Sequence, residues 1–235
     1  MNEVNSIRLN KYIAMAGICG RREADELIVK GAVRINGNVI SKLGTIVNND
    51  DKVEVNGKEI HLVKNKIYIV LNKPKGIVCT SNDELGRKTV IDIVNSKERL
   101  FTIGRLDKDS EGLIILTNDG DFSQKLSHPS NVVEKEYQLT LLGGDDTVEK
   151  VVEKFISGLK IDKHLMKVRK VELINANQNN YTFKIVLHQG YNRQLRKMSE
   201  ALQLKVVSLL RVRIGKLKIK NLKSGNYCSF DPKEV

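Results

Sequence analysis

The sequence predicts an α+β fold in two parts. A small N-terminal unit of two helices and short strands precedes a mainly antiparallel β-sheet domain with flanking helices. Helical periodicity covers residues 6–30, whereas strands separated by turns dominate from residue 66 onward. Hydrophobic residues make up 40% of the 235 residues, which is enough for a core. We place the two domains at residues 1–62 and 66–235.

The N-terminal unit begins with two predicted helices. Residues 7–17 (IRLNKYIAMAG) and 20–31 (GRREADELIVKG) each bring apolar side chains to one face and end at a glycine. Short strands follow, in AVRING and KVEVNGKEI. Asn36-Gly37 and Asn56-Gly57 are the residue pairs that favour a two-residue hairpin turn.

The second part alternates short apolar segments with turns, and no repeat is visible. Strands are predicted at residues 67–71, 78–80, 102–103, 113–117, 137–142, 181–187 and 205–214. Helices are predicted at residues 89–94, 119–126, 147–158 and 193–201.

Charge and composition limit the classes of function. The formal net charge is +12, and residues 190–223 hold ten Lys or Arg and one Glu, a net charge of +9. Such a basic segment suits a phosphate backbone. The three cysteines are far apart and give no disulfide framework or metal pair, and no apolar run is long enough for a membrane span. We therefore expect a cytoplasmic protein that binds a polyanion.

The segment from Gly104 to Leu113, GRLDKDSEGL, is the strongest candidate for chemistry. It holds five charged residues between two apolar segments that both have the pattern of buried strands. Arg105 and Asp107 lie two positions apart, on the same side of an extended backbone. A carboxylate beside an arginine is stabilised in its ionised form, which suits a nucleophile or a general base.

This segment resembles the catalytic loop of the RNA pseudouridine synthases, specifically the RsuA group that modifies ribosomal RNA. Three further segments resemble motifs of the same family in the same order: NKPKG (72–76), EKEYQL (134–139) and GYNRQLRKM (190–198). Residues 8–11, 20–24 and 31–37 resemble the S4 RNA-binding domain. Together the resemblances cover nearly the whole chain.

The family resemblance implies roles for four residues. Asp107 is the expected catalytic carboxylate, and Tyr137 is expected to stack on the base during its rotation. Arg196, which we favour over Arg193, is expected to pair with Asp107. Arg105 is expected to fill the gap that the flipped nucleotide leaves. Each also has a structural alternative: an incidental ion pair in a solvated turn for Asp107, a core aromatic for Tyr137, a phosphate contact for Arg196, and a second partner of Asp107 for Arg105.

RNA binding is predicted for basic residues in both parts. In the N-terminal unit they can gather on the helical pair, although neighbouring acidic residues could instead form salt bridges with them. The predicted RNA-binding residues are Arg8, Lys11, Arg21 and Arg22 in this unit, and Lys73, Arg193 and Lys197 in the second part.

The implied reaction turns a uridine of ribosomal RNA into pseudouridine, and it needs neither cofactor nor metal. The sequence accordingly lacks a Walker loop, a G-x-G-x-x-G turn and a metal cluster. Asp107 could attack the substrate covalently or remove a sugar proton to give a glycal; both routes remain open. The expected partner is ribosomal RNA or a pre-ribosomal particle, with 23S favoured over 16S RNA, and the expected state is a monomer without a nucleotide cofactor or membrane contact.

Two other functions compete with this interpretation. A non-catalytic RNA-binding protein in ribosome assembly would have no use for a carboxylate facing a polyanion. A hydrolase could pair Asp107 with Asp109 or Glu111. His128 and His188 are weaker acid–base candidates, and Ser110 has no evident triad partners.

Overall fold

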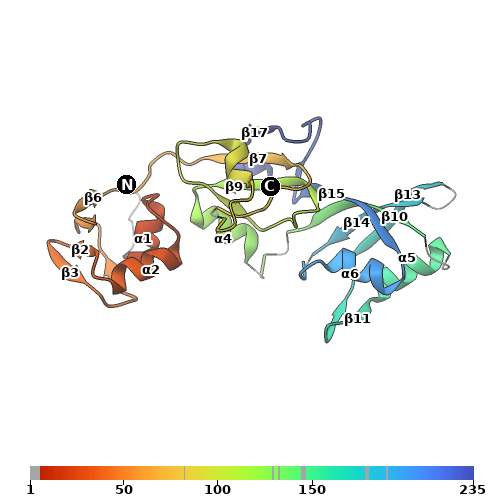
Figure 1. Cartoon of the computed structure of the whole chain (residues 1–235), viewed down its shortest axis with the longest axis horizontal. Helices are drawn as coiled ribbons and strands as arrows, with labels where there is room; N and C mark the ends of the chain where they lie inside the picture. The colour runs from red at the N-terminus through yellow and green to blue at the C-terminus, as the bar shows by residue number, and fades with distance from the viewer. Residues whose placement is uncertain are drawn as a thin grey trace. The chain divides into compact units, whose positions relative to one another are not determined.

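The computed structural model describes residues 6–81, 83–128, 130–131, 133–143, 147–177, 180–188 and 190–235; the start of the predicted N-terminal domain, residues 1–5, lies outside them. The chain divides into two compact units (Figure 1). The first consists of the chain up to residue 67 with residues 96–100 and 118–120, and the second holds the remainder. In the described part, no helix has the length and apolar character needed to cross a membrane.

The N-terminal unit contains the two predicted helices, α1 (Leu9–Met15) and α2 (Arg21–Val29). The first begins two residues later than predicted, because Ile7 and Arg8 form a short strand instead. This strand, β1 (Ile7–Arg8), pairs with β4 (Ile46–Val47), a partner too distant in sequence for local periodicity to reveal.

Four further strands form an antiparallel sheet in the order β3-β2-β5-β6. They are β2 (Val33–Ile35), β3 (Asn38–Ile40), β5 (Val53–Val55) and β6 (Lys58–Ile60). Both predicted hairpin turns are confirmed: Asn36 and Asn56 have φ of +51°, and the glycine after each is also left-handed. The unit has its own core, in which Leu9 and Ile13 of α1 join buried residues of α2 and the strands.

Nine described strands of the second unit form one sheet, with the main order β13-β14-β10-β15-β9-β7-β17. β8 pairs with β9, and β16 pairs with β15. The β9–β15 pair is parallel, and the other pairs between named strands are antiparallel, which confirms the predicted sheet type. The bounds are β7 (Tyr68–Lys73), β8 (Phe101–Ile103), β9 (Glu111–Thr117), β10 (Lys135–Leu142), β13 (Lys170–Asn177), β14 (Asn180–Leu187), β15 (Lys205–Ile214), β16 (Leu217–Lys218) and β17 (Tyr227–Ser229).

The helices of the second unit match the sequence prediction within one residue at either end. They are α3 (Val90–Val94), α4 (Gly120–Ser127), α5 (Val148–Ser157) and α6 (Gln194–Ala201), and a 3₁₀ turn (Pro232–Glu234) follows near the C-terminus. Thr89 and Thr147 cap α3 and α5 with their side-chain oxygens. Phe122 of α4 packs against a core of β7, β8 and β9 residues, while α5 contacts β13 and α6 contacts β15 (Figure 1).

Several strands were not predicted. β13 is an edge strand whose described residues are mostly exposed, so it lacks the apolar alternation that marks a strand. β11 (Leu159–Ile161) and β12 (His164–Met166) form a separate short hairpin. The strand predicted at residues 78–80 is only a single bridge between Val78 and Thr89.

Candidate active site

Residues 104–110, the predicted catalytic loop, join β8 to β9. It ends at a strand whose central residues, Leu113 to Leu116, are fully buried. Leu106 is also buried, and its N–H lies 3.4 Å from the Cys79 sulfur. The Ser110 N–H donates to the Asp107 carbonyl at 3.0 Å and closes a turn. The loop is therefore anchored at both ends and in its middle, which fixes the position of Asp107.

Gly112 allows the backbone of β15 to approach the end of this loop. Its φ is +106°, and a Cβ at this position would lie 2.3 Å from the Arg211 carbonyl oxygen. The two residues pair in the parallel β9–β15 contact. Only glycine fits here, because a side chain would collide with backbone that cannot move independently of the sheet.

Lys73 supports the predicted catalytic loop through hydrogen bonds from its buried side chain to backbone carbonyls. Its side chain is fully buried, and its ammonium group donates to the carbonyls of Pro74 at 2.9 Å, Ile77 at 2.8 Å and Lys108 at 3.3 Å. Burial lowers the pKa of this lysine. The prediction that Lys73 binds RNA phosphates is therefore wrong: the amine holds the 74–77 turn against the catalytic loop.

Two arginines lie beside the Asp107 carboxylate. Its Oδ2 is 3.7 Å from Nη1 of Arg193 and 4.0 Å from Nε of Arg196. The Asp107 side chain is 27% exposed, so it is accessible yet partly shielded. The sequence favoured Arg196 as the partner, but the structure places both arginines at the carboxylate, with Arg193 slightly nearer.

Arg196 also holds the catalytic loop itself. Its Nη2 donates to the Asp109 carbonyl at 2.9 Å and to the Ser110 hydroxyl at 3.2 Å. Burial lowers the pKa of this guanidinium, as does neighbouring Arg193, while Asp107 opposes the shift. Within the described residues its Nε finds no hydrogen-bond partner. Arg196 thus couples α6 to the loop that carries Asp107.

Tyr137 and Arg211 face each other across the β10–β15 pair. Tyr137 is 9% exposed, and its hydroxyl lies 3.5 Å from Nη1 of Arg211. Arg211 is 2% exposed and donates from Nε to the Leu113 carbonyl at 2.7 Å and from Nη1 to the Arg105 carbonyl at 3.3 Å. Sequence reasoning missed Arg211. The available signal was its position two residues from Leu209 in an alternating strand, which places it on a buried face.

Asp107, Tyr137, Arg193 and Arg211 line a cleft of about 740 Å³, whereas Arg196 and Lys73 are not among its described lining residues. All described lining residues belong to the second unit, and most come from the predicted catalytic loop, β10, β15, α4 and the segment that leads into α6. Among the lining residues are Arg105, Asp107, His128, Lys135, Tyr137, His188, Tyr191, Arg193, Gln194 and Arg211.

The inner part of the cleft is electropositive. Burial lowers the pKa of Lys135, and the nearby Arg211 charge lowers it further. The Nη2 of Arg211 is buried and has no hydrogen-bond partner within the described part of the chain. Desolvated cationic donors of this kind attract an acceptor or an anionic group of a substrate.

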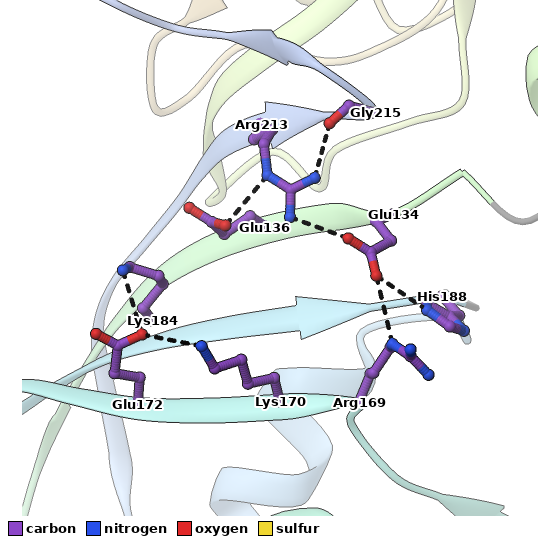
Figure 2. Close-up of polar contacts among 9 residues, drawn as sticks. All are labelled: Glu134, Glu136, Arg169, Lys170, Glu172, Lys184, His188, Arg213 and Gly215. Carbon is purple, nitrogen blue, oxygen red and sulfur yellow. Dashed lines mark hydrogen bonds and ion pairs between the residues drawn. The ribbon is translucent and has the colours of Figure 1, made fainter.

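A charged network crosses the sheet beside the start of β10 (Figure 2). Glu134 Oε1 lies 3.2 Å from Nε2 of His188 and 3.4 Å from Nε of Arg169, and its Oε2 lies 3.2 Å from Arg213. Arg213 also pairs with Glu136 at 3.1 Å. His188 lines the cleft, so the network ties the cleft wall to β10 through Glu136 and to β15 through Arg213.

The remaining predicted site residues differ in their surroundings. Arg105 is exposed at the cleft and, within the described residues, has no ion pair with Asp107. Lys197 forms an ion pair with Asp162, so its charge is already partly neutralised. Asp109 and Glu111 are not among the described residues that line the cleft, which weakens a second carboxylate role for either.

The N-terminal unit presents most of its predicted RNA-binding residues to solvent. Arg8, Arg21 and Arg22 are exposed, and Lys11 is half-buried. Arg21 and Arg22 form the first turn of α2. This exposure is compatible with phosphate contacts.

Comparisons with known proteins agree with this arrangement. The model of the RNA pseudouridylate synthase family matches residues 67–201, and that of the S4 domain matches residues 7–53. Ribosomal large subunit pseudouridine synthase B of Bacillus subtilis is 36% identical, and the alignment covers 97% of this chain and 93% of that protein.

Two further similarities cover nearly the full chain. The dual-specificity RNA pseudouridine synthase RluF of Escherichia coli K12 is 40% identical over 98% of this chain and 78% of that protein. A crystal structure of a pseudouridylate synthase aligns with a TM-score of 0.65 and 28% identity, covering 97% of this chain and 98% of that one. The chain therefore belongs to the RNA pseudouridylate synthase family and is an enzyme of that family with an N-terminal S4 domain.

Proposed function

We propose that this enzyme converts a specific uridine of ribosomal RNA to pseudouridine, with Asp107 as the catalytic carboxylate. The observation that carries the proposal is the position of Asp107 in the cleft, with Arg193 and Arg196 within 4.0 Å of it. The large subunit is the favoured source of the substrate, because the Bacillus subtilis relative is named for that subunit.

The reaction changes connectivity and keeps composition. The bond between N1 of uracil and C1′ of ribose breaks, a bond between C5 and C1′ forms, the C5 proton leaves, and N1 gains a proton. Asp107 acts either as a nucleophile or as a base that removes a sugar proton; both routes need an ionised carboxylate held in place. Arg193 and Arg196 hold the carboxylate in place and provide the positive charge beside it.

Tyr137 contacts the uracil while it turns. A stacking contact tolerates rotation of the base within its plane, whereas directional hydrogen bonds would have to break and form again. Support comes from the place of Tyr137 in the cleft wall, where Arg211 holds its hydroxyl. Arg105, exposed beside the same cleft, replaces the target nucleotide in its stack.

The S4 domain adds affinity for folded RNA. Arg8, Lys11, Arg21 and Arg22 contact phosphates, and we place the functional boundary between residues 62 and 66. Arg193 at the cleft and Lys197 on α6 contribute further phosphate contacts. We further propose that the enzyme works as a monomer in the cytoplasm; its three cysteines, which are far apart in the sequence and form no disulfide framework, support a reducing compartment.

Mapping of pseudouridines in ribosomal RNA tests this function. RNA from cells with and without the gene is compared, and the purified enzyme is then added to RNA from the deletion strain. We expect one or a few uridines of large-subunit RNA to lose the modification and the enzyme to restore it. Identical maps from both strains, with no modification in vitro, would contradict the proposed substrate.

A further inference from the structure

Tyr191 is the more exposed of the two tyrosines among the described cleft residues. It is 37% exposed, whereas Tyr137 is 9% exposed. Its ring stacks on the imidazole of His164, with centroids 5.0 Å apart and an interplanar angle of 24°. Because His164 stacks on one face of the ring, a further stacking partner must use the opposite face.

The surrounding contacts hold this aromatic pair in place. His164 belongs to the β11–β12 hairpin, and Lys197 of α6 forms an ion pair with Asp162 in the turn of that hairpin. Gln194, which is buried, accepts the Tyr191 N–H at 3.2 Å and donates to the Lys167 carbonyl at 2.9 Å. The hairpin and the segment before α6 are therefore fastened together, and the Tyr191 ring loses little freedom when it binds a ligand.

The charges around the pair suit a nucleic acid. Lys160, Lys163 and Lys167 are exposed on or beside the hairpin. Arg193, two residues from Tyr191, reaches the catalytic carboxylate. A phosphate backbone that delivers a uridine to Asp107 thus passes positive charge on the Tyr191 side of the cleft.

We infer that Tyr191, backed by His164, is a stacking site for an unpaired base adjacent to the target uridine. The inference rests on the proposed function, since it places an RNA strand in the cleft. A nucleotide that flips out leaves its neighbour without a stacking partner. An exposed tyrosine beside the cleft replaces that lost contact, and it accepts any base because every base has a π-face.

The competing explanation is that the Tyr191–His164 contact only fastens the hairpin. The two explanations predict different results for the substitution Tyr191→Leu. Leucine retains apolar packing on the imidazole but offers no aromatic face, so it preserves a fastening and removes a stacking site. Phenylalanine preserves both.

Fluorescence of a defined RNA tests the inference. The probe is a nonamer with four uridines on each side of a central 2-aminopurine, whose emission falls when it stacks. The parent protein is the full chain with Asp107→Asn, so that binding is measured without turnover. We expect the parent to quench the probe, and Tyr191→Leu to lose most of the quenching and to bind about 5- to 100-fold more weakly. Tyr191→Phe should behave as the parent.

Tyr227→Leu serves as the matched control, because Tyr227 is 45% exposed on β17 and is not among the described cleft residues. Equal quenching by Tyr191→Leu and the parent would overturn the inference. If the leucine variant melts at a lower temperature, His164→Ala decides: retained quenching without the imidazole supports a base stack on Tyr191, and loss equal to that of the leucine variant contradicts it. If quenching depends on Tyr191 but the wild-type chain forms no pseudouridine, the proposed function is refuted and the stacking site is still supported.

Discussion

Arg211 carries a permanent positive charge inside the sheet, at 2% exposure, and it connects three parts of the active site. Sequence patterns normally assign a charged strand residue to the solvent face. The long-range partners that make its burial tolerable, the carbonyls of Leu113 and Arg105, lie about a hundred residues earlier in the chain. Asp107, Tyr137 and Arg196 were predicted because short contiguous motifs carry them; Arg211 and the buried Lys73 depend on contacts that no local pattern contains.

Substitutions of Tyr137 separate stacking from core packing. The Tyr137 hydroxyl is 3.5 Å from Arg211, at the limit of a hydrogen bond, so its removal costs at most about 1 kcal/mol. Tyr137→Phe should therefore bind RNA nearly as well as the wild type. Tyr137→Ala should lose about 1–3 kcal/mol of binding free energy and most turnover. Wild-type binding and rates in both variants would show that Tyr137 is only a core residue.

At the level of elements, the site depends on one parallel contact in a mostly antiparallel sheet. β9 and β15 meet where the catalytic loop ends, and Gly112 permits that contact. The sequence predicted both strands, and for β9 also its buried character, but it could not give their pairing. Pairing between strands separated by about a hundred residues is decided by the complete sheet.

Alanine substitutions of Gly112 and Gly104 test the contact between β9 and β15. Gly112→Ala places a methyl group 2.3 Å from the Arg211 carbonyl oxygen at a φ of +106°, and we expect it to lower the free energy of unfolding by about 3 kcal/mol or more. Gly104→Ala is the control, because its φ of +71° is strained but no atom lies within 4 Å; it should cost about 1–2 kcal/mol. Equal losses in urea denaturation would argue against a special role of the β9–β15 approach.

The Glu134 network makes stability depend on acid pH. The hydrogen bond with His188 lowers the pKa of the Glu134 carboxyl, with further help from Arg213. A carboxyl with a lowered folded pKa stabilises the protein above its unfolded pKa of about 4.3, and this contribution disappears as pH falls through the folded value. Glu134→Gln should therefore flatten the fall of stability below about pH 4.5.

The effect should be modest, because the Glu134 side chain is 36% exposed and salt screens it. Urea denaturation between pH 3 and 6, at low and at high salt, measures this contribution to the free energy of unfolding. Glu149→Gln, an exposed position on α5, is the control. If Glu134→Gln and Glu149→Gln give the same pH profile, the network does not contribute as described.

For the whole molecule, net charge was a good guide to the partner class and a poor guide to the binding surface. Residues 190–223 carry a net charge of +9, yet Arg211 is buried and Arg213 is paired with Glu134 and Glu136. Part of the basic segment therefore lies in the interior of the active site or in ion pairs and is not available to RNA. Composition counts charges but does not show which of them face solvent.

Deletion of residues 1–62 tests the division of labour between the two parts. The N-terminal unit has its own core, so the remaining chain should fold. The truncated enzyme should bind RNA more weakly, and the slope of binding against salt should fall by about 0.7 for each single-strand phosphate contact removed. At saturating RNA its single-turnover rate should approach that of the full chain. A folded truncation with no saturated rate would place part of the N-terminal unit in the active site.

The central claim is that Asp107 performs the chemistry, and tritium release from RNA labelled at C5 of uridine measures it directly. Asp107→Asn keeps the shape of the side chain and removes the charge, so the rate should fall on the order of 10⁴-fold or more while RNA binding persists. Asp109→Asn, two residues away with its side chain exposed, should retain turnover. Appreciable release by folded Asp107→Asn, or an equal loss in Asp109→Asn, would contradict the assignment.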